Sequence, residues 1–272
     1  MARPPGHIPA GTIPGWPEEF SPGSNLTFKH AIGEDIARWW QESIYERTHL
    51  FPGGFAEKLS EGLPGDHSYI YHQIDPVTRF VKLEMLGSTS SIPIWLHEQH
   101  IFLQNETVFE SAVIIDNPYQ GQGFGKQLIS NVYGVARDLG IVQITLSAAM
   151  MGKYFWAQLG FLPDRDSWES LLRPGIHSKL LSLGKHVPDD VRIRVLRLLE
   201  SLEPETIRAI ADFRDLVPSS IKEYMTADGR QKMIPLGMAL LAEIDVPWYG
   251  VLDLRDNDSV EVFQNEIRRR RK

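Results

Sequence analysis

The chain has 272 residues, of which 42% are apolar and 10% aromatic, enough to bury the core of one or two ordinary domains. Its formal net charge of −7 argues against a protein built to coat nucleic acid, and no apolar run is long enough to cross a membrane. The absence of cysteine excludes disulfides, thiolate metal sites and a covalent acyl-cysteine intermediate.

The N-terminal segment, residues 1–24, is rich in proline and glycine. These residues disfavour helix and sheet pairing, so we expect a flexible or extended arm. Trp16 and Phe20 are its candidates for docking on the body of the protein. The segment lacks the apolar core of a secretory signal, and we expect a cytoplasmic protein.

The predicted elements begin with a short strand at 26–30. A helix follows at 33–50, with Trp39 and Trp40 on its inward stripe, and a shorter helix at 55–63. The hydrophobic period then shifts towards two, which predicts strands at 68–74, 79–87, 92–103 and 107–115. Short polar turns separate these four strands, so we expect an antiparallel meander.

A glycine-rich segment follows the last of these strands. The apolar run Val113–Ile115 precedes it, and an amphipathic helical pattern begins at Phe124. A strand that enters a helix through such a turn leaves backbone N–H groups unpaired at the helix N-terminus. Together with the helix dipole, these groups favour a phosphate or pyrophosphate ligand.

Glycine spacing separates the possible phosphate ligands. A dinucleotide loop requires Gly-x-Gly-x-x-Gly, which is absent, and a nucleoside-triphosphate loop requires Ser or Thr where Gln127 follows Lys126. The pattern present is Gln-x-x-Gly-x-Gly, formed by Gln120, Gly123 and Gly125. It resembles the coenzyme A pyrophosphate loop of the GNAT superfamily of N-acyltransferases.

A second motif supports this resemblance. A new apolar strand is predicted at 141–146, and a short aromatic-rich helix then closes on Gly160-Phe161. GNAT enzymes carry a helix of this kind against the pantetheine arm. The resemblance implies an α+β fold with a mixed, mostly antiparallel sheet and helices on both faces, in three layers. It also implies that a parallel strand pair splays apart to hold the acyl thioester.

The resemblance further implies a set of cofactor-binding residues. Backbone groups of the loop would hold the pyrophosphate, the strand before it would pair with the pantetheine amides, and an aromatic residue of the short helix would contact the cofactor. In chain order these residues are Val113, Ile114, Ile115, Gln120, Gly121, Gln122, Gly123, Phe124, Gly125, Lys126 and Trp156.

The catalytic acid departs from the family pattern. Many GNAT enzymes place a tyrosine four residues before the glycine of Gly-Phe, and here that position is Trp156, whose indole N–H is too weak an acid. Tyr154 is the candidate instead, although two residues turn a helix by about 200°. The asparagine common near the start of this helix is also missing, with 148–150 in its place.

Two carboxylates are candidates for the catalytic base. Glu110 lies on the fourth strand of the meander, and its odd spacing from Val113 places the two on opposite faces of the sheet. Glu98 lies on the neighbouring strand, and either residue could equally be a surface group. His97 and His100 flank Glu98, but they do not form His-Glu-x-x-His and point to opposite faces, so we expect no metal site.

The region after the core is longer than a minimal GNAT domain needs. Helices are predicted at 167–183, 191–202 and 204–216, whereas 234–254 is apolar and compatible with either a strand or a buried helix. We therefore predict an arm at 1–24, an acyl-CoA-binding domain at 25–166 and a mainly helical extension at 167–272. The extension would act as a lid, a dimer contact or an interaction module.

The predicted function is transfer of an acetyl or longer acyl group from acyl-CoA to a primary amine, directly and within a ternary complex. The acceptor would be a small molecule, a peptide or a protein. Nucleic acid is disfavoured except through the basic stretch 267–272, which is read as a solvated tail. The alternative is a catalytically inactive CoA-binding interaction or effector module with the same fold. A nucleotide-binding protein is the third reading.

Overall fold

The computed structural model describes residues 20, 25–90, 92–220 and 231–269. The chain divides into two compact units, unit 1 (residues 1–141) and unit 2 (residues 142–272). Phe20 of the predicted arm is 5% exposed, and its ring centroid lies 6.1 Å from those of Phe28 and of Trp40. The rest of the arm, including Trp16, and residues 270–272 lie outside the described residues.

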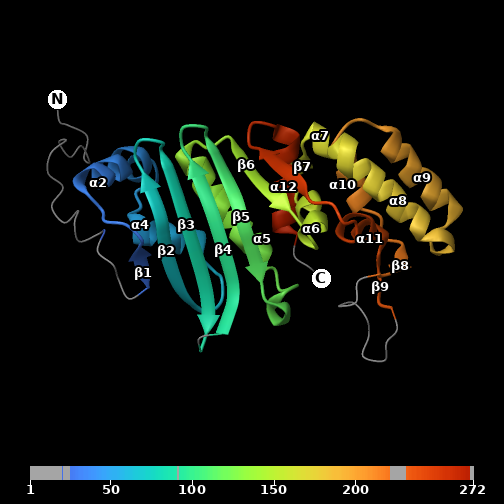
Figure 1. Cartoon of the computed structure of the whole chain (residues 1–272), viewed down its shortest axis with the longest axis horizontal. Helices are drawn as coiled ribbons and strands as arrows, with labels where there is room; N and C mark the ends of the chain where they lie inside the picture. Colours follow the sequence, from blue (N-terminus) through green and yellow to red (C-terminus); the bar gives the residue numbers. More distant parts are fainter. Residues whose placement is uncertain (1–19, 21–24, 91, 221–230, 270–272) are drawn as a thin grey trace. The chain divides into compact units, whose positions relative to one another are not determined.

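The sheet of unit 1 confirms the predicted meander (Figure 1). Four strands pair with antiparallel neighbours in chain order, and a first short strand, β1, is parallel to the second. The strands are β1 (Leu26–Phe28), β2 (Asp66–Asp75), β3 (Phe80–Thr89), β4 (Ile92–Phe102) and β5 (Thr107–Ile115). The sheet is therefore mixed and mostly antiparallel, as predicted.

The helices of unit 1 are α2 (Glu34–Trp40), α3 (Glu46–Thr48), α4 (Pro52–Leu59) and α5 (Phe124–Leu139). A π-helical turn, η1 (Gln41–Tyr45), joins α2 to α3, so the predicted helix 33–50 is one continuous helical run. The helix predicted at 55–63 begins earlier, because Pro52 in a first helical turn forgoes no hydrogen bond.

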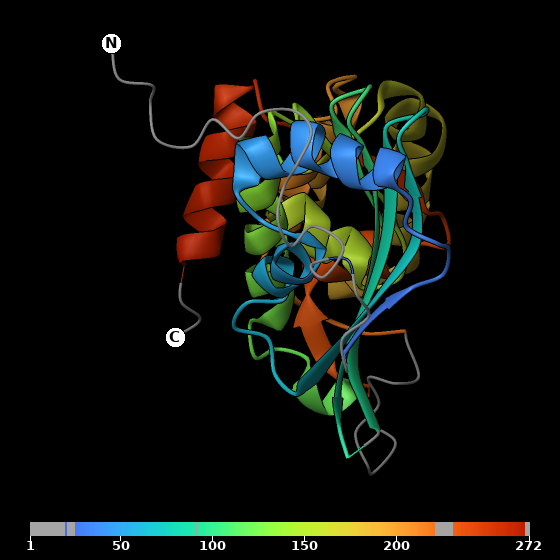
Figure 2. The same ribbon diagram turned by 90° about the vertical axis from the view of Figure 1, so that its left-hand side faces the viewer.

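The core of unit 1 lies on one face of its sheet. Alternate residues of β2, β3 and β4 are buried, as the period of a strand requires. The Trp40 ring packs edge-on against Phe55 and Tyr71 at 5.5 and 5.6 Å, and the Tyr71 hydroxyl donates to the Pro52 carbonyl at 2.8 Å. Helices α2, α4 and α5 lie on this side of the sheet (Figure 2).

The sheet of unit 2 has an order that the sequence did not predict. Strand β10 (Trp248–Asp253) pairs antiparallel with both β6 (Gln143–Ala148) and β7 (Leu162–Pro163). Strand β10 therefore lies between β6 and β7 in the sheet, although the segment 164–247 separates it from both along the chain. This segment is an insertion between paired strands, and the region predicted as an extension supplies a strand of the sheet.

Helices make up most of unit 2. They are α6 (Gly152–Gln158), α7 (Arg165–Ser167), α8 (Arg173–Ser182), α9 (Asp189–Glu200), α10 (Thr206–Ala211), α11 (Leu236–Ala242) and α12 (Asn257–Arg268). A π-helical turn, η3 (Trp168–Leu172), joins α7 to α8, and a 3-10 turn, η4 (Gly184–His186), follows α8. The helices predicted at 167–183 and 191–202 are confirmed.

The helix predicted at 204–216 is wrong at its C-terminal end. Helix α10 stops at Ala211, and 216–218 form a short strand, β8 (Leu216–Pro218), paired with β9 (Met233–Pro235). The Leu236 N–H donates to the Asp215 carbonyl at 2.7 Å, and the Gly237 N–H donates to the Phe213 carbonyl at 3.0 Å. These bonds to α11 occupy the carbonyls of residues 213 and 215, which therefore do not continue the helix. The undecided region 234–254 contains β9, α11 and β10.

Candidate functional site

The glycine loop connects β5 to α5 in unit 1. A 3-10 turn, η2 (Asn117–Tyr119), follows the strand, and α5 begins at Phe124. Gly121 and Gly123 have φ angles of 79° and 94°, in the left-handed region that glycine adopts without a steric penalty. The predicted strand, loop and helix are therefore confirmed, and two of the glycines are explained by backbone conformation.

Two glutamine side chains brace this loop. The Gln120 Nε2 donates to the Ile115 carbonyl at 2.9 Å, and the Gln122 Nε2 donates to the Pro118 carbonyl at 3.0 Å. The Asp116 N–H donates to the Ile94 carbonyl at 2.8 Å, which attaches the start of the loop to β4. Both glutamines thus hold the turn in shape through their side-chain amides.

The N-terminus of α5 offers the features that an anion requires. The Gln127 N–H donates to the Gly123 carbonyl at 3.0 Å as the first bond of the helix, so the preceding amides point out of its end. No acidic residue lies in the first turn. A Cβ placed on Gly123 would meet nothing within 4 Å, so the space beside it is open. These features fit a diphosphate.

A β-bulge on β5 separates the predicted catalytic residue Glu110 from the predicted cofactor-binding residues Val113–Ile115. Opposite β4, Glu98 pairs with Ala112 whereas Gln99 pairs with Glu110, so Ser111 is the extra residue. Val113 pairs with His97, two residues before Gln99 on β4. Directly paired residues share a face, so Glu110 and Val113 lie on the same face of the sheet. The prediction that they face opposite sides is wrong, because it assumed a regular strand.

A buried polar cluster lies at this bulge. It consists of His97, Gln99 and Glu110, whose exposed fractions are 0%, 1% and 3%. The His97 Nε2 forms a short hydrogen bond with the Glu110 Oε2. Among the described residues, the His97 Nδ1, the Glu110 Oε1 and both amide atoms of Gln99 have no partner. On the β3 side the cluster meets apolar neighbours, since Met85 and Leu83 pair with His97 and Gln99.

Glu98 lies on the opposite face of β4. Its carboxylate accepts from Lys82 at 3.3 Å and from His100 at 3.2 Å. Burial raises the pKa of Glu98, but hydrogen bonds from Ser111 and Lys82 outweigh burial and hold it below its usual value. A carboxylate stabilised in its ionised form is a weaker base, so the environment of Glu98 disfavours it as a proton acceptor.

The candidate acid lies on α6 in unit 2. The Tyr154 hydroxyl accepts from the Arg214 guanidinium at 2.8 Å. With the Gln158 amide turned so that its oxygen faces the cluster, that oxygen accepts from the Tyr154 hydroxyl at 2.9 Å and from Arg214 at 3.2 and 3.3 Å. Arg214 comes from the insertion, and nothing in the local sequence marks it as a neighbour of Tyr154.

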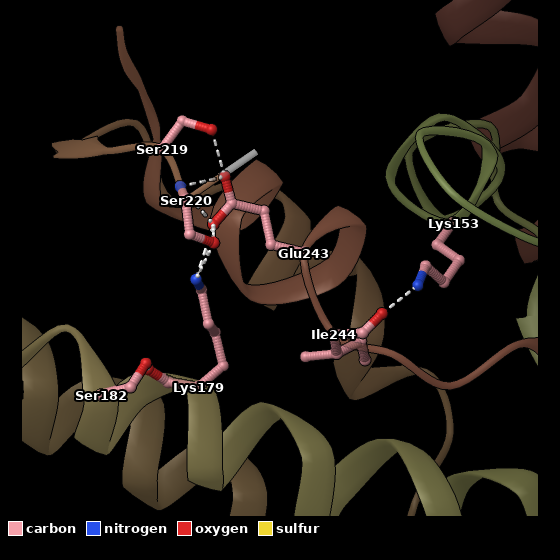
Figure 3. A network of polar contacts seen from close by, with 7 residues as sticks. All are labelled: Lys153, Lys179, Ser182, Ser219, Ser220, Glu243 and Ile244. Carbon is pink, nitrogen blue, oxygen red and sulfur yellow. Dashed lines mark hydrogen bonds and ion pairs between the residues drawn. The ribbon is translucent and has the colours of Figure 1, made fainter. Parts of the chain in front are cut away.

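Other residues of α6 are anchored within unit 2. Trp156 is 6% exposed, and its ring lies 5.2 Å from that of Phe161, so it belongs to the core here. Lys153 is buried and donates to the Ile244 carbonyl (Figure 3). Burial lowers the pKa of the Lys153 ammonium, and nearby Asp245 opposes this shift. These contacts fix the helix that carries Tyr154.

Within the described parts of the chain, no helix is long and apolar enough to cross a membrane. The same residues contain no group of three or more His, Asp or Glu side chains arranged to hold a metal ion. His97 and His100 do point to opposite faces of β4, as their spacing predicts, since His97 is buried while His100 contacts Phe80 at 5.6 Å.

Sequence reasoning identified Glu110 and Tyr154 but missed their partners. No sequence motif marks His97 or Gln99 as a neighbour of Glu110. Their shared face follows from period two along β4, yet their proximity to Glu110 depends on a bulge. The small residues Ser111 and Ala112 are the only local signal of that irregularity.

Comparison with known proteins agrees with the motifs. Residues 38–161 match the Acetyltransferase (GNAT) family. No curated protein sequence matches the chain.

Three solved structures resemble the chain. An acetyltransferase from Bacillus cereus ATCC 14579 is 15% identical over 34% of this chain, with a TM-score of 0.29. A nourseothricin acetyltransferase is 13% identical over 34% of the chain, with a TM-score of 0.27. An aminoglycoside 6'-N-acetyltransferase complexed with coenzyme A is 10% identical over 64% of the chain, with a TM-score of 0.26.

The matched regions span 66%, 56% and 73% of those three proteins, and the TM-scores are too low to support a functional argument. The family match and the motif that carries it are sufficient for the assignment. Residues 38–161 form a domain of the GNAT acetyltransferase family.

Proposed function

We propose that the protein transfers an acetyl or longer acyl group from acyl-CoA to a primary amine, directly and without an acyl-enzyme intermediate. The observation that carries this proposal is the exposed Gly121–Gly123 turn at the N-terminus of α5, within a GNAT domain. Its left-handed glycines and outward-facing amides support a diphosphate ligand. The absence of cysteine in the sequence supports direct transfer.

The proposed cofactor contacts follow the loop. The backbone of Gly121, Gly123, Gly125 and Lys126 would bind the pyrophosphate, and Gln120 and Gln122 would keep the loop in shape. The backbone of Val113–Ile115 would pair with the pantetheine amides as an added strand. Trp156 remains a proposed cofactor contact, although its packing in unit 2 limits the surface that it offers.

The proposed acid and base come from different environments. The buried cluster that contains Glu110 is the preferred location of the base, with Glu98 the weaker candidate. Tyr154 is proposed to protonate the leaving thiolate, and Arg214 beside its hydroxyl would stabilise the phenolate that remains.

Substitution of Gly123 tests the cofactor site. Gly123→Glu places a carboxylate beside the pyrophosphate, and we expect CoA affinity to fall at least about 100-fold, since two like charges repel in a site shielded from water. Gly123→Ala is the matched control, because it adds the left-handed backbone strain and a methyl group in open space without a charge. Calorimetry with CoA measures both variants.

Turnover decides between the proposed function and its alternative. Thiol release from acetyl-CoA is measured with a panel of primary amines, with Tyr154→Phe in the same assay. Turnover by the wild type supports the transferase, and a loss of about 100-fold in the variant supports Tyr154 as the acid. CoA binding without thiol release favours an inactive CoA-binding module. Unchanged affinity in Gly123→Glu contradicts the loop assignment for either reading.

A further inference from the structure

The polar cluster at the β-bulge of unit 1 contains four buried polar atoms that have no hydrogen-bond partner among the described residues. A buried polar atom without a partner destabilises the folded state, because it has lost its hydrogen bonds to water. His97 Nδ1, Glu110 Oε1 and the Gln99 amide are all in this state among the described residues. Such groups persist where water, a ligand or a reaction uses them.

The single contact inside the cluster sets its chemistry. The His97 Nε2 is bonded to the Glu110 Oε2, and a carboxylate in its ionised form can only accept, so in that state the proton on this bond is on Nε2. A neutral imidazole has one protonated nitrogen. A neutral ring bonded in this way has its lone pair on Nδ1, the ring atom that has no partner in the described residues.

The cluster also has the right position along β5. If the pantetheine arm runs from the loop back along Val113–Ile115, its far end, which carries the acyl group, lies near Ser111 of β5. Val113 is the cross-strand partner of His97, so the imidazole lies on the β4 strand opposite this end. This step rests on the proposed function, which supplies the direction of the arm.

We propose that His97 is the general base of the transferase and that Glu110 orients it. The Nδ1 lone pair takes an N–H proton from the neutral acceptor amine as the amine nitrogen bonds to the acyl carbon. The C–S bond breaks, its electron pair leaves on sulfur, and the thiolate becomes the free thiol by taking the hydroxyl proton of the proposed acid, Tyr154. Glu110 stabilises the imidazolium that forms. The base expected from sequence, Glu110 itself, becomes a positioning residue.

Two substitutions distinguish these roles. His97→Gln keeps an N–H donor for Glu110 and much of the side-chain volume but removes the basic nitrogen. We expect kcat/KM, measured with acetyl-CoA and an amine that the wild type acetylates, to fall at least about 100-fold. The affinity for CoA should stay within about 2-fold of wild type. Glu110→Gln leaves His97 in place and lowers kcat/KM by about 10-fold. His100→Gln, on the other face of β4, is the control and stays near wild type.

The opposite order overturns the proposal. If Glu110 is the base, Glu110→Gln is the more severe variant and His97→Gln, which retains the bond to Glu110, is mild. A wild type that binds CoA without turnover overturns the proposed function itself. A measurement on the wild type that needs no activity tests the role of His97 independently of the proposed function.

That measurement is the tautomer of His97. The full chain is labelled with ¹⁵N in its histidine rings, and long-range ¹H–¹⁵N correlation distinguishes the two nitrogens, with His97→Gln to assign the signals. We expect a neutral ring protonated on Nε2 and bare on Nδ1. A ring protonated on Nδ1, neutral or cationic, overturns the proposal.

Discussion

Gly87 on β3 is required for a steric reason, unlike Gly121 and Gly123, whose backbone angles favour glycine. A Cβ at this position would lie 2.0 Å from the Trp95 Nε1, and the buried indole is held by its bond to the Pro64 carbonyl at 2.9 Å. Overpacking of a core costs about 1–3 kcal/mol. We expect Gly87→Ala to lower the free energy of unfolding by about 3 kcal/mol in chemical denaturation.

Gly134 provides the matched comparison. It lies in the interior of α5, where an added Cβ would meet nothing within 4 Å. Replacing a helical glycine with alanine removes backbone entropy from the unfolded chain, so Gly134→Ala should raise stability by about 0.5–1 kcal/mol. Equal effects of the two substitutions would show that the Trp95 contact does not constrain Gly87.

The same residues show what the sequence can and cannot predict at this scale. The glycine loop was predictable because Gly121 and Gly123 act through their own backbone angles. Glu110 was found by its residue type and strand position, but its face was not, since a bulge at Ser111 depends on pairing with β4. Arg214 approaches Tyr154 only through the tertiary fold of the insertion.

Among the elements of unit 2, α8, α11 and the segment after β8 are joined by one carboxylate (Figure 3). Glu243, after α11, has a side chain that is 1% exposed and lies 2.6 Å from the Lys179 Nζ of α8. Its oxygens also accept from the Ser220 N–H at 3.0 Å and from the Ser219 hydroxyl. This network fixes the position of the insertion helices relative to each other.

The network predicts a pH-dependent stability. Burial raises the pKa of Glu243, but hydrogen bonds from Lys179, Ser219 and Ser220 outweigh burial and lower it below 4.5. A carboxyl whose folded-state pKa is lowered stabilises the fold fully above its unfolded pKa. That contribution is lost as the pH falls from about 4.5 through the lower folded-state value.

Glu243→Gln tests this contribution. Lys179 keeps some exposure, so we expect a loss of about 2 kcal/mol at neutral pH, below the cost of about 3–5 kcal/mol for a fully buried pair. The variant should also lose part of the decline of stability in acid. Glu169→Gln, from the exposed pair with Arg165, should cost about 0.5 kcal/mol or less. Equal pH profiles for wild type and Glu243→Gln would contradict the assignment.

Sequence patterns also reached their limit at the level of elements. Strong periodicity predicted the meander and α5, because each buries one face of a regular element. The region 234–254 gave no period, and it proves to hold a strand, a helix and another strand. Its ambiguity arises because α11 is largely buried and shows no polar face, while the outward positions of β10 include the uncharged Tyr249 and Val251.

For the molecule as a whole, the position of β10 makes the C-terminal region part of the sheet of unit 2. The insertion 164–247 leaves the sheet of unit 2 after β7 and returns to it at β10. Strand β10 covers the edge of β6, whose Ile144 and Leu146 are 0% and 1% exposed. The boundary predicted at residue 166 would separate a strand from both of its neighbours.

A truncated chain ending at Asp166 therefore tests the architecture. Without β10, the edge of β6 has unpaired backbone groups and exposed apolar side chains, and such edges promote aggregation. We expect the amides of residues 143–148 to lose protection from hydrogen exchange and the protein to lose solubility. A chain ending at Arg255 is the matched comparison, because it keeps β10 and lacks only Asp256, α12 and the residues after it. It should retain protection across β6. Equal protection in both truncated chains would mean that β10 is dispensable, and the predicted domain ending at 166 would then be a folding unit after all.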